Sequence, residues 1–322
     1  MKNRWYISLF IIFLVTTELI HADTVKSFSN LSNTKRIVFL GDSITQGGEY
    51  VVDFQCWLLA NHLNIEVLNL GLSSETASLL TTPENKEHVL KYGFARPYIG
   101  ERIERVLKAT KPDMVIACYG MNDGGSLPRD EAGTKRYADA ITYLRGVSLK
   151  YGVKDVILCT PPVHDAKGDA KAFYHDENLT RYSDWLLQKR ILNWHVVDIH
   201  TPMKMALLKN RSLNPEFSFA KDGVHPDRKG HWVMAHAILT QEFGVNLDHV
   251  NAAEDFFPLH GAEIRKLVHE KMTTQFNYWM SLTKHLRPNV SGGPGVKSSV
   301  TISSMNEKVA ILDKSIAQLI LN

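Results

Sequence analysis

The sequence predicts an α/β fold with a parallel β-sheet, and three observations support this prediction. Five short runs of apolar and β-branched residues alternate with longer segments of helical character. Each run is apolar almost throughout, as expected for a strand that is covered on both faces. Small and polar residues follow several of these runs directly, at the edge where such sheets bind their ligands.

The predicted strands and helices alternate along the main part of the chain. The strands are expected at residues 36–40, 65–70, 113–119, 156–160 and 195–199. The helices are expected near residues 51–62, 99–109, 132–150, 177–188 and 229–242. Short strands separated by helices form βαβ units, which produce a parallel sheet with helices packed against it.

The region after residue 250 has a different pattern. Apolar side chains recur at helical spacing through residues 263–285, a segment rich in Gly, Pro and Ser follows at 288–299, and a second helix is expected at 304–321. Such a pair of helices is small for an independent fold. We therefore divide the chain into a signal peptide (1–22), a main domain (23–250) and a helical extension packed on the main domain (251–322).

The N-terminus has the layout of a signal peptide. Lys2 and Arg4 precede an apolar stretch at residues 5–15, and Ala22 is a small residue suited to cleavage. The stretch is short for a membrane span, and Glu18 interrupts it further. We expect a secreted or periplasmic protein without membrane insertion after cleavage. An uncleaved membrane anchor is the alternative.

Composition and charge exclude several kinds of partner. The hydrophobic fraction of 44% is that of a globular protein with a core. The 37 basic and 34 acidic residues nearly balance, at a net charge of +3, and no basic run is present, so nucleic acid is not an expected partner. The three cysteines cannot all pair within one chain, and no His or Cys cluster has metal-binding spacing.

Ser43 is the first candidate for a catalytic residue. It follows the first apolar run at the sequence Gly41-Asp42-Ser43, where a strand is expected to turn into a helix. A serine there can act as a nucleophile if a base lies beside it. The alternative is a helix N-cap, a common role for serine.

Asp222 and His225 are the candidates for the other two members of a catalytic triad. A histidine can take the serine proton near neutral pH, and an aspartate that accepts its other ring N–H holds the ring in the required tautomer. The two intervening residues let one turn present both side chains. The alternative is an ordinary turn built by Asp-Gly and Pro226.

Gly71 and Asn122 are the candidates for an oxyanion hole, which stabilises the negative oxygen of an acyl-transfer intermediate. Gly71 follows the second strand and lets its backbone N–H approach closely, and the Asn122 amide is a neutral donor after the third strand. Asp123 is expected to brace this loop. The alternatives are a plain turn glycine and an Asx turn. All these residues fall at the carboxyl ends of strands, which predicts a single site.

Four blocks of residues, in this order and spacing, resemble those of the SGNH, or GDSL, hydrolases. They are Gly41-Asp42-Ser43, Gly71, Gly120-Met121-Asn122-Asp123 and Asp222-Gly223-Val224-His225. The resemblance implies a flavodoxin-like three-layer sandwich with a five-stranded parallel sheet of order 2-1-3-4-5. It also implies a Ser-His-Asp esterase that needs no metal or cofactor. The extension after residue 250 is not covered by it.

The resemblance assigns a role to each matching residue. Ser43 resembles the nucleophile, His225 the base and Asp222 its orienting partner. The backbone N–H groups of Ser43 and Gly71 and the side chain of Asn122 resemble the oxyanion donors. One departure is visible, because Leu72-Ser73-Ser74 stands where the second block often has another glycine. Ser74 is therefore a candidate for lining the substrate pocket.

Four further residues in loops after strands are candidates for pocket lining, although ordinary loop surface is the favoured interpretation of each. They are His164, Tyr92, Phe94 and Arg96. For the whole chain we expect a serine ester hydrolase that acts on a small-molecule or glycan ester. Removal of O-acetyl groups from carbohydrates is favoured, because exported members of this size resemble carbohydrate O-acetylesterases. The alternatives are a lysophospholipase, lipase or thioesterase, and an inactive glycan-binding relative.

Overall fold

A five-stranded parallel sheet forms the centre of the computed structural model, which describes residues 29–165, 170–297 and 300–321. The strands are β1 (Arg36–Gly41), β2 (Glu66–Asn69), β3 (Met114–Cys118), β4 (Asp155–Cys159) and β5 (His195–Val197). Their order is β2-β1-β3-β4-β5. The predicted α/β class and the order 2-1-3-4-5 are therefore confirmed, and each predicted strand overlaps an observed one.

The register of the sheet brings the ends of the central strands to one level. Gly41 at the end of β1 lies opposite Cys118 at the end of β3, and Cys118 lies opposite Cys159 at the end of β4. All residues of β3 are buried, since helices cover both faces of the sheet. The loops that follow β1 and β3 consequently leave the sheet side by side, which places Ser43 and Asn122 at the same edge.

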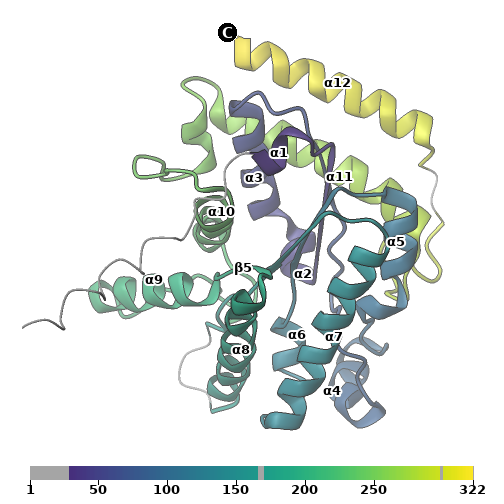
Figure 1. Ribbon diagram of the computed structural model, residues 1–322, viewed down its shortest axis with the longest axis vertical. Helices are drawn as coiled ribbons and strands as arrows, with labels where there is room; N and C mark the ends of the chain where they lie inside the picture. Colours follow the sequence, from purple (N-terminus) through teal and green to yellow (C-terminus); the bar gives the residue numbers. More distant parts are fainter. Residues whose placement is uncertain (1–28, 166–169, 298–299, 322) are drawn as a thin grey trace, which may run out of the picture.

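Helices pack on both faces of the sheet (Figure 1). One face carries α3 (Glu49–Ala60) and α10 (Arg228–Phe243), which contact each other. The other face carries α5 (Ile103–Thr110) and α7 (Glu131–Lys150), which also contact each other. Next to α7 lies α8 (Ala170–Gln188), which also contacts β5. This arrangement buries a core of aliphatic and aromatic side chains that includes all three cysteines, each unpaired.

Several helices differ from the prediction. Two of the longer helices were not predicted, α4 (Thr82–Tyr92) and α9 (His200–Leu213). The helix expected to begin at residue 177 begins at Ala170, and the one expected from residue 99 begins with the 3-10 turn η1 (Ile99–Glu101) before α5. The short helices α1 (Ser29–Ser32) and α6 (Met121–Gly124) and the 3-10 turn η2 (Lys189–Leu192) were also not predicted. The short helix α2 (Ser43–Gly47) begins at Ser43, where a strand was expected to turn into a helix.

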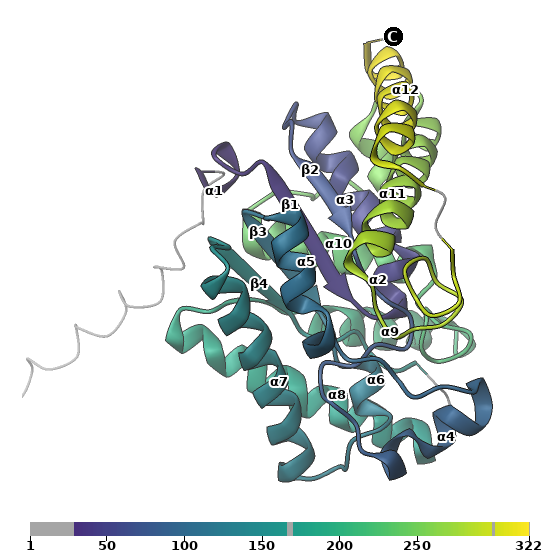
Figure 2. The same cartoon turned by 90° about the vertical axis from the view of Figure 1, so that its right-hand side faces the viewer.

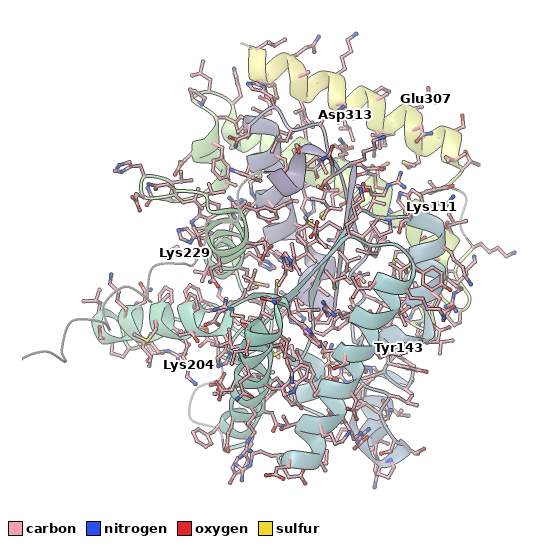
Figure 3. The ribbon with its side chains drawn as sticks, in the orientation of Figure 1. Lys111, Tyr143, Lys204, Lys229, Glu307 and Asp313 are labelled. Atoms are coloured by element: carbon pink, nitrogen blue, oxygen red, sulfur yellow. The ribbon has the colours of Figure 1, made fainter. Side chains whose placement is uncertain are left out.

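The C-terminal extension contains η3 (Ala253–Phe256) and two long helices, α11 (Gly261–Thr283) and α12 (Ile302–Leu321). Helix α11 contacts α3, α5 and the edge strand β2, and α12 lies along the outer side of α11 (Figure 2). Arg265 of α11 forms ion pairs with Asp53 and Glu49 of α3. Asp313 of α12, labelled in Figure 3, pairs with Lys271 at 2.5 Å.

The signal peptide and the domain boundary at residue 250 remain predictions. The predicted signal peptide at residues 1–22 lies outside the described residues. The division at residue 250 stays a prediction, although the extension packs closely on the main domain. Within the described part of the chain, no helix combines the length and apolar character that a membrane crossing requires.

Candidate active site

Ser43 is positioned by a sharp turn between β1 and α2. Asp42 is the N-cap of α2, and its side chain accepts a hydrogen bond of 2.9 Å from the Ile44 N–H. The helix-cap role that was the alternative for Ser43 therefore belongs to its neighbour. Gly41 is required for close packing, because a Cβ atom there would lie 2.7 Å from the Cys118 carbonyl oxygen. The Ser43 hydroxyl is left available at the edge of the sheet.

The structure brings together the three predicted catalytic residues. The Ser43 Oγ lies 2.8 Å from Nε2 of His225, across a sequence separation of 182 residues. The Nδ1 of His225 lies 2.6 Å from Oδ2 of Asp222. If Nδ1 carries the proton and donates it to Asp222, then Nε2 can accept the Ser43 hydroxyl proton. This geometry is that of a nucleophile, a base and an orienting carboxylate.

The Asp222 carboxylate is held in its ionised form. Its Oδ1 accepts the backbone N–H groups of Val224 at 2.9 Å and His225 at 2.8 Å. Burial acts to raise the pKa of Asp222, but the hydrogen bonds from His225 and Val224 outweigh it and lower that pKa to about 2. The side chains of Asp222 and His225 are 57% and 51% exposed, so solvent and a bulky substrate can reach them.

Asp165, which follows β4, holds the loop that carries Asp222 and His225 through several hydrogen bonds. The carboxylate of Asp165 accepts hydrogen bonds from the Ala220 N–H at 2.9 Å and the Ser218 hydroxyl at 2.8 Å. Its own backbone N–H donates to the Gly223 carbonyl at 2.8 Å, and Arg211 forms an ion pair with its side chain. Asp165 was not predicted as a functional residue, because its only signal in the sequence is its position after a strand.

Asn122 is oriented by two hydrogen bonds. Its Nδ2 donates to the Glu75 carbonyl at 2.9 Å, and its Oδ1 accepts from Nη1 of Arg96 at 2.7 Å. One N–H of the amide is thus left for an oxyanion. Asp123 next to it braces the loop as expected, since its buried carboxylate accepts the Ala77 and Ser78 N–H groups at 3.0 and 2.9 Å.

Gly71 does not have the geometry expected of an oxyanion donor. Its N–H donates instead to Oδ1 of Asn69 at 3.0 Å. A Cβ atom at this position would lie 2.5 Å from the backbone nitrogen of Gln46 in α2. The glycine is therefore needed so that the loop after β2 can pack against the helix that carries the nucleophile.

The backbone of Ser74, in the same loop as Gly71, lies beside Asn122. The φ of Ser74 is 68°, a left-handed conformation that favours glycine, and Ser74 lies in the run Leu72-Ser73-Ser74, where the resemblance led us to expect a second glycine. Among the described residues, no hydrogen bond from the Ser74 N–H is present. The carbonyl of the next residue, Glu75, accepts from Asn122, so the Ser74 backbone adjoins the Asn122 amide. Ser74 was expected to line the pocket with its side chain. Its backbone N–H is now a candidate for an oxyanion donor, because it lies beside the Asn122 amide.

A buried ion pair supports the loop that contains Ser74. Both side chains of the Arg102–Glu75 pair are fully buried, and the Arg102 Nε lies 2.6 Å from the Glu75 Oε1. Arg102 also donates to the Leu70 carbonyl at 2.7 Å, and the Tyr119 hydroxyl donates to the Glu75 Oε2 at 2.7 Å. Each buried charge is thus paired and hydrogen-bonded, as burial requires.

The other pocket-lining candidates divide into two groups. The ring of His164 lies 4.2 Å from that of His175, and its backbone N–H donates to Asp176, which also binds Lys204 of α9 (Figure 3). Tyr92 and Phe94 pack around the ring of His88 at centroid distances of 4.7 and 4.8 Å. The contacts described for His164, Tyr92 and Phe94 are with side chains outside the triad and the oxyanion candidates. Arg96 forms the second group, because it contacts the oxyanion candidate Asn122.

Comparison with known proteins identifies related chains. The model of the GDSL-like lipase/acylhydrolase family matches residues 39–233, more than half of the chain. No curated protein sequence matches the chain.

Among solved structures, an acetylxylan esterase from Geobacillus stearothermophilus, Axe2, is 24% identical, and the alignment covers 64% of this chain and 93% of Axe2 with a TM-score of 0.47. BT4096, described as a gut microbial diltiazem-metabolizing enzyme, is 20% identical with a TM-score of 0.48. That match covers 65% of this chain and less than half of BT4096, 46% of its length.

Proposed function

Because the chain belongs to the GDSL-like lipase/acylhydrolase family and is a carboxylic ester hydrolase, we propose that it removes O-acetyl groups from carbohydrates through a covalent intermediate on Ser43. The observation that carries the mechanism is the continuous hydrogen-bonded chain from the Ser43 hydroxyl through His225 to Asp222.

In the first half of the reaction the Ser43 Oγ attacks the ester carbonyl carbon while Nε2 of His225 takes the hydroxyl proton. The carbonyl oxygen becomes negative, and we assign its stabilisation to the N–H groups of Ser43 and Ser74 and to the Asn122 amide. One such donor contributes on the order of 3 kcal/mol to the transition state. His225 then returns the proton to the departing sugar hydroxyl, which leaves Ser43 acylated.

In the second half water replaces the sugar. His225 takes a proton from a water molecule, the resulting hydroxide attacks the acyl carbon, and the same donors stabilise the second oxyanion. Collapse of the intermediate breaks the bond to Ser43 Oγ, which recovers its proton from His225, and acetic acid is released and loses its proton to solvent. Asp222, whose pKa is about 2, remains ionised throughout and stabilises the positive charge that His225 carries twice in the cycle.

The side chains near the nucleophile favour a short acyl group and a polar alcohol. Gln46, in the same short helix as Ser43, accepts hydrogen bonds of 2.6 Å from both the N–H and the hydroxyl of Ser73. Asn122, in the loop after β3, and Arg96, which donates a hydrogen bond to it, add further polar groups. A long acyl chain needs an apolar channel, whereas sugar hydroxyls find donors and acceptors in such surroundings.

A second candidate is hydrolysis of a longer acyl ester, as in a lysophospholipase or thioesterase. The observation that favours it is a set of exposed apolar side chains in and beside α4, which lies beyond the carboxyl ends of the strands (Figure 2). Leu79, Leu90 and Tyr92 are 64%, 76% and 53% exposed. Such side chains could contact an acyl chain that runs along the surface.

The test is an esterase assay with p-nitrophenyl acetate and p-nitrophenyl octanoate, followed by acetylated oligosaccharides. We expect acetate esters to be turned over faster than octanoate esters, and the Ser43→Ala protein to be inactive. Faster turnover of octanoate would replace the acetyl assignment with the long-chain alternative. Activity that survives in Ser43→Ala would refute the nucleophile, and binding of glycans without turnover of any ester would indicate an inactive relative.

The place of action is part of the proposal. Lys2, Arg4 and the apolar residues 5–15 support export, and a glycan substrate outside the cytoplasm fits an exported enzyme. Expression of the full chain with its own N-terminus, followed by the intact mass of the protein from the medium or periplasm, tests this. A mass that includes residues 1–22 would show that the segment is retained.

A further inference from the structure

The side chain of Arg96 forms its hydrogen bonds with Asn122 and Ser74, two candidates for oxyanion donors. Its Nη1 donates to Oδ1 of Asn122 at 2.7 Å and lies 3.4 Å from the Ser74 carbonyl. Its backbone is fixed as well, since its N–H donates to Oδ1 of Asn85 at 2.8 Å. Among the described residues, no carboxylate lies within ion-pair distance of its guanidinium, and its buried Nε has no hydrogen-bond partner.

An arginine in this situation is not explained by stability alone. Burial lowers the pKa of Arg96, and the carboxylates of Asp123 and Asp42 oppose that shift from beyond contact distance. Removal of a cation from water is costly when no carboxylate pairs with it directly. The shorter of the two hydrogen bonds of the guanidinium goes to a neutral amide, that of the oxyanion candidate Asn122, and the longer one goes to the Ser74 carbonyl.

The hydrogen bonds of Asn122 show what Arg96 does to it. If the amide were flipped, its NH₂ group would face the Arg96 N–H donors and its oxygen would face the Glu75 carbonyl. Both contacts would then be repulsive. Arg96 and Glu75 together therefore allow one orientation, in which Oδ1 and one N–H are used and the second N–H is left over.

We propose that Arg96 is a positioning residue for the hydrolytic reaction, which locks the Asn122 amide in its donor orientation and strengthens the remaining N–H as a donor to the oxyanion. A charge-assisted hydrogen bond to the amide oxygen withdraws electron density from the nitrogen, so the N–H binds a negative oxygen more strongly than a neutral one. The gain appears where the negative charge develops, in the transition state. This inference rests on the proposed function, because it concerns the same site.

The test is a double-mutant cycle with p-nitrophenyl acetate on Arg96→Ala, Asn122→Ala and the double variant. We expect Arg96→Ala to lower kcat by about 10-fold to 100-fold, less than the loss of the whole donor, with KM nearly unchanged. Because Arg96 acts through Asn122, the double variant should be no slower than Asn122→Ala. Arg96→Lys should recover part of kcat, and added guanidinium should partly rescue Arg96→Ala.

Arg287→Ala is the matched control. Arg287 lies over the ring of Phe94 at 4.3 Å and so belongs to the same region, but it has no contact with Asn122. Arg287→Ala should keep the kcat of the wild type. Circular dichroism and thermal unfolding check that each variant is folded. If Arg96→Ala does not fold, Arg96→Gln and Arg96→Lys take its place in the cycle, since both retain a hydrogen-bonding head group.

Three results would overturn the inference. Additive losses in the double variant would show that Arg96 acts independently of Asn122. A rise in KM confined to esters that carry a carboxylate, with kcat intact, would show that Arg96 binds the substrate directly. Wild-type kcat in Arg96→Ala would remove its role. In each case Ser43-dependent activity of the wild type leaves the proposed function standing, whereas a wild type that hydrolyses no ester would refute both proposals.

Discussion

Met272 of the C-terminal extension contacts Asn69 at the end of strand β2, with Sδ 3.4 Å from the Asn69 Nδ2. The same Nδ2 donates to the Thr45 carbonyl at 2.6 Å, within the helix that begins at Ser43, and the Asn69 Oδ1 accepts the Gly71 N–H. A residue outside the part of the chain that matches the family thus packs directly behind the nucleophile helix.

This contact predicts that Met272→Ala lowers both stability and activity. The Met272 side chain is 3% exposed, and truncation of such a side chain costs about 2–5 kcal/mol in the free energy of unfolding. A cavity beside Asn69 should also lower kcat. Urea unfolding and p-nitrophenyl acetate kinetics measure the two effects. Met205→Ala is the control, since Met205 is 62% exposed and its loss should change the free energy of unfolding by less than about 0.5 kcal/mol.

Asp165→Asn is predicted to loosen the loop that carries Asp222 and His225. The asparagine NH₂ would face backbone N–H donors such as that of Ala220, and the ion pair between the buried Asp165 carboxylate and the partly exposed Arg211 would be lost. Leaving a buried backbone donor without its acceptor costs about 1–3 kcal/mol of stability. We expect kcat to fall as well, because His225 is no longer held at the Ser43 hydroxyl.

Asp313→Asn provides the comparison for Asp165→Asn. Asp313 also pairs with a basic residue, Lys271, but its side chain is 46% exposed, so its loss should cost less than about 1 kcal/mol. Equal destabilisation by the two substitutions would contradict the anchoring role. Unchanged kcat in a folded Asp165→Asn protein would contradict the effect on the catalytic loop.

Asp42 predicts a dependence of stability on pH. Burial raises the pKa of Asp42 from 3.8 to about 7, against the opposing effect of the Ile44 hydrogen bond. Between these two values the folded state binds a proton that the unfolded state has lost, so this group makes the protein less stable as pH rises from about 4 through 7.

Asp42→Asn removes this titration while its side-chain oxygen can still cap α2. We therefore expect the variant to gain stability relative to the wild type as pH rises from about 4 to 7. Urea unfolding at a series of pH values measures the difference. A difference that is constant over this range would show that Asp42 does not titrate there.

Ser74→Gly is predicted to keep full activity and to raise stability. Glycine adopts the φ of 68° without the strain of a Cβ atom, which corresponds to about 1 kcal/mol, and it retains the backbone N–H. Thermal unfolding and kcat on p-nitrophenyl acetate check the two expectations. A large loss of kcat would instead assign a function to the Ser74 hydroxyl.

The sheet and the triad could be predicted because their signals are local in the sequence. Each strand is a continuous apolar run, since both faces are covered, and Ser43 and His225 stand in short motifs in loops after strands. Parallel pairing then brings these loops to one edge. The observed distance of 2.8 Å between Ser43 Oγ and His225 Nε2 agrees with that reasoning.

The two long helices that were missed lack such local signals. Helix α4 is polar and begins at a cap where the Thr81 N–H donates to Glu84, and its composition hides the helical period. In α9 the apolar residues Met205 and Leu208 are 62% and 57% exposed, so apolar positions do not mark a single buried face.

The roles of Gly71 and Ser74 could not be distinguished from the sequence for a different reason. Gly71 and Ser74 stand three residues apart in one loop, and only the hydrogen bond from Gly71 to Asn69 and the left-handed backbone of Ser74 distinguish their roles. The contact of Arg96 with Asn122 joins two loops through side chains and has no counterpart in a sequence pattern.

The position of α11 has a consequence for assembly. Strand β2 is at one end of the sheet, and an end strand ordinarily offers its free backbone groups to a strand of another molecule. Here α11 lies against β2, tied to α3 by the ion pairs of Arg265. A second copy therefore cannot continue the sheet at that end while α11 is in place. A protein shortened to the region that matches the family would expose β2 as an unpaired edge strand, open to pairing with another molecule.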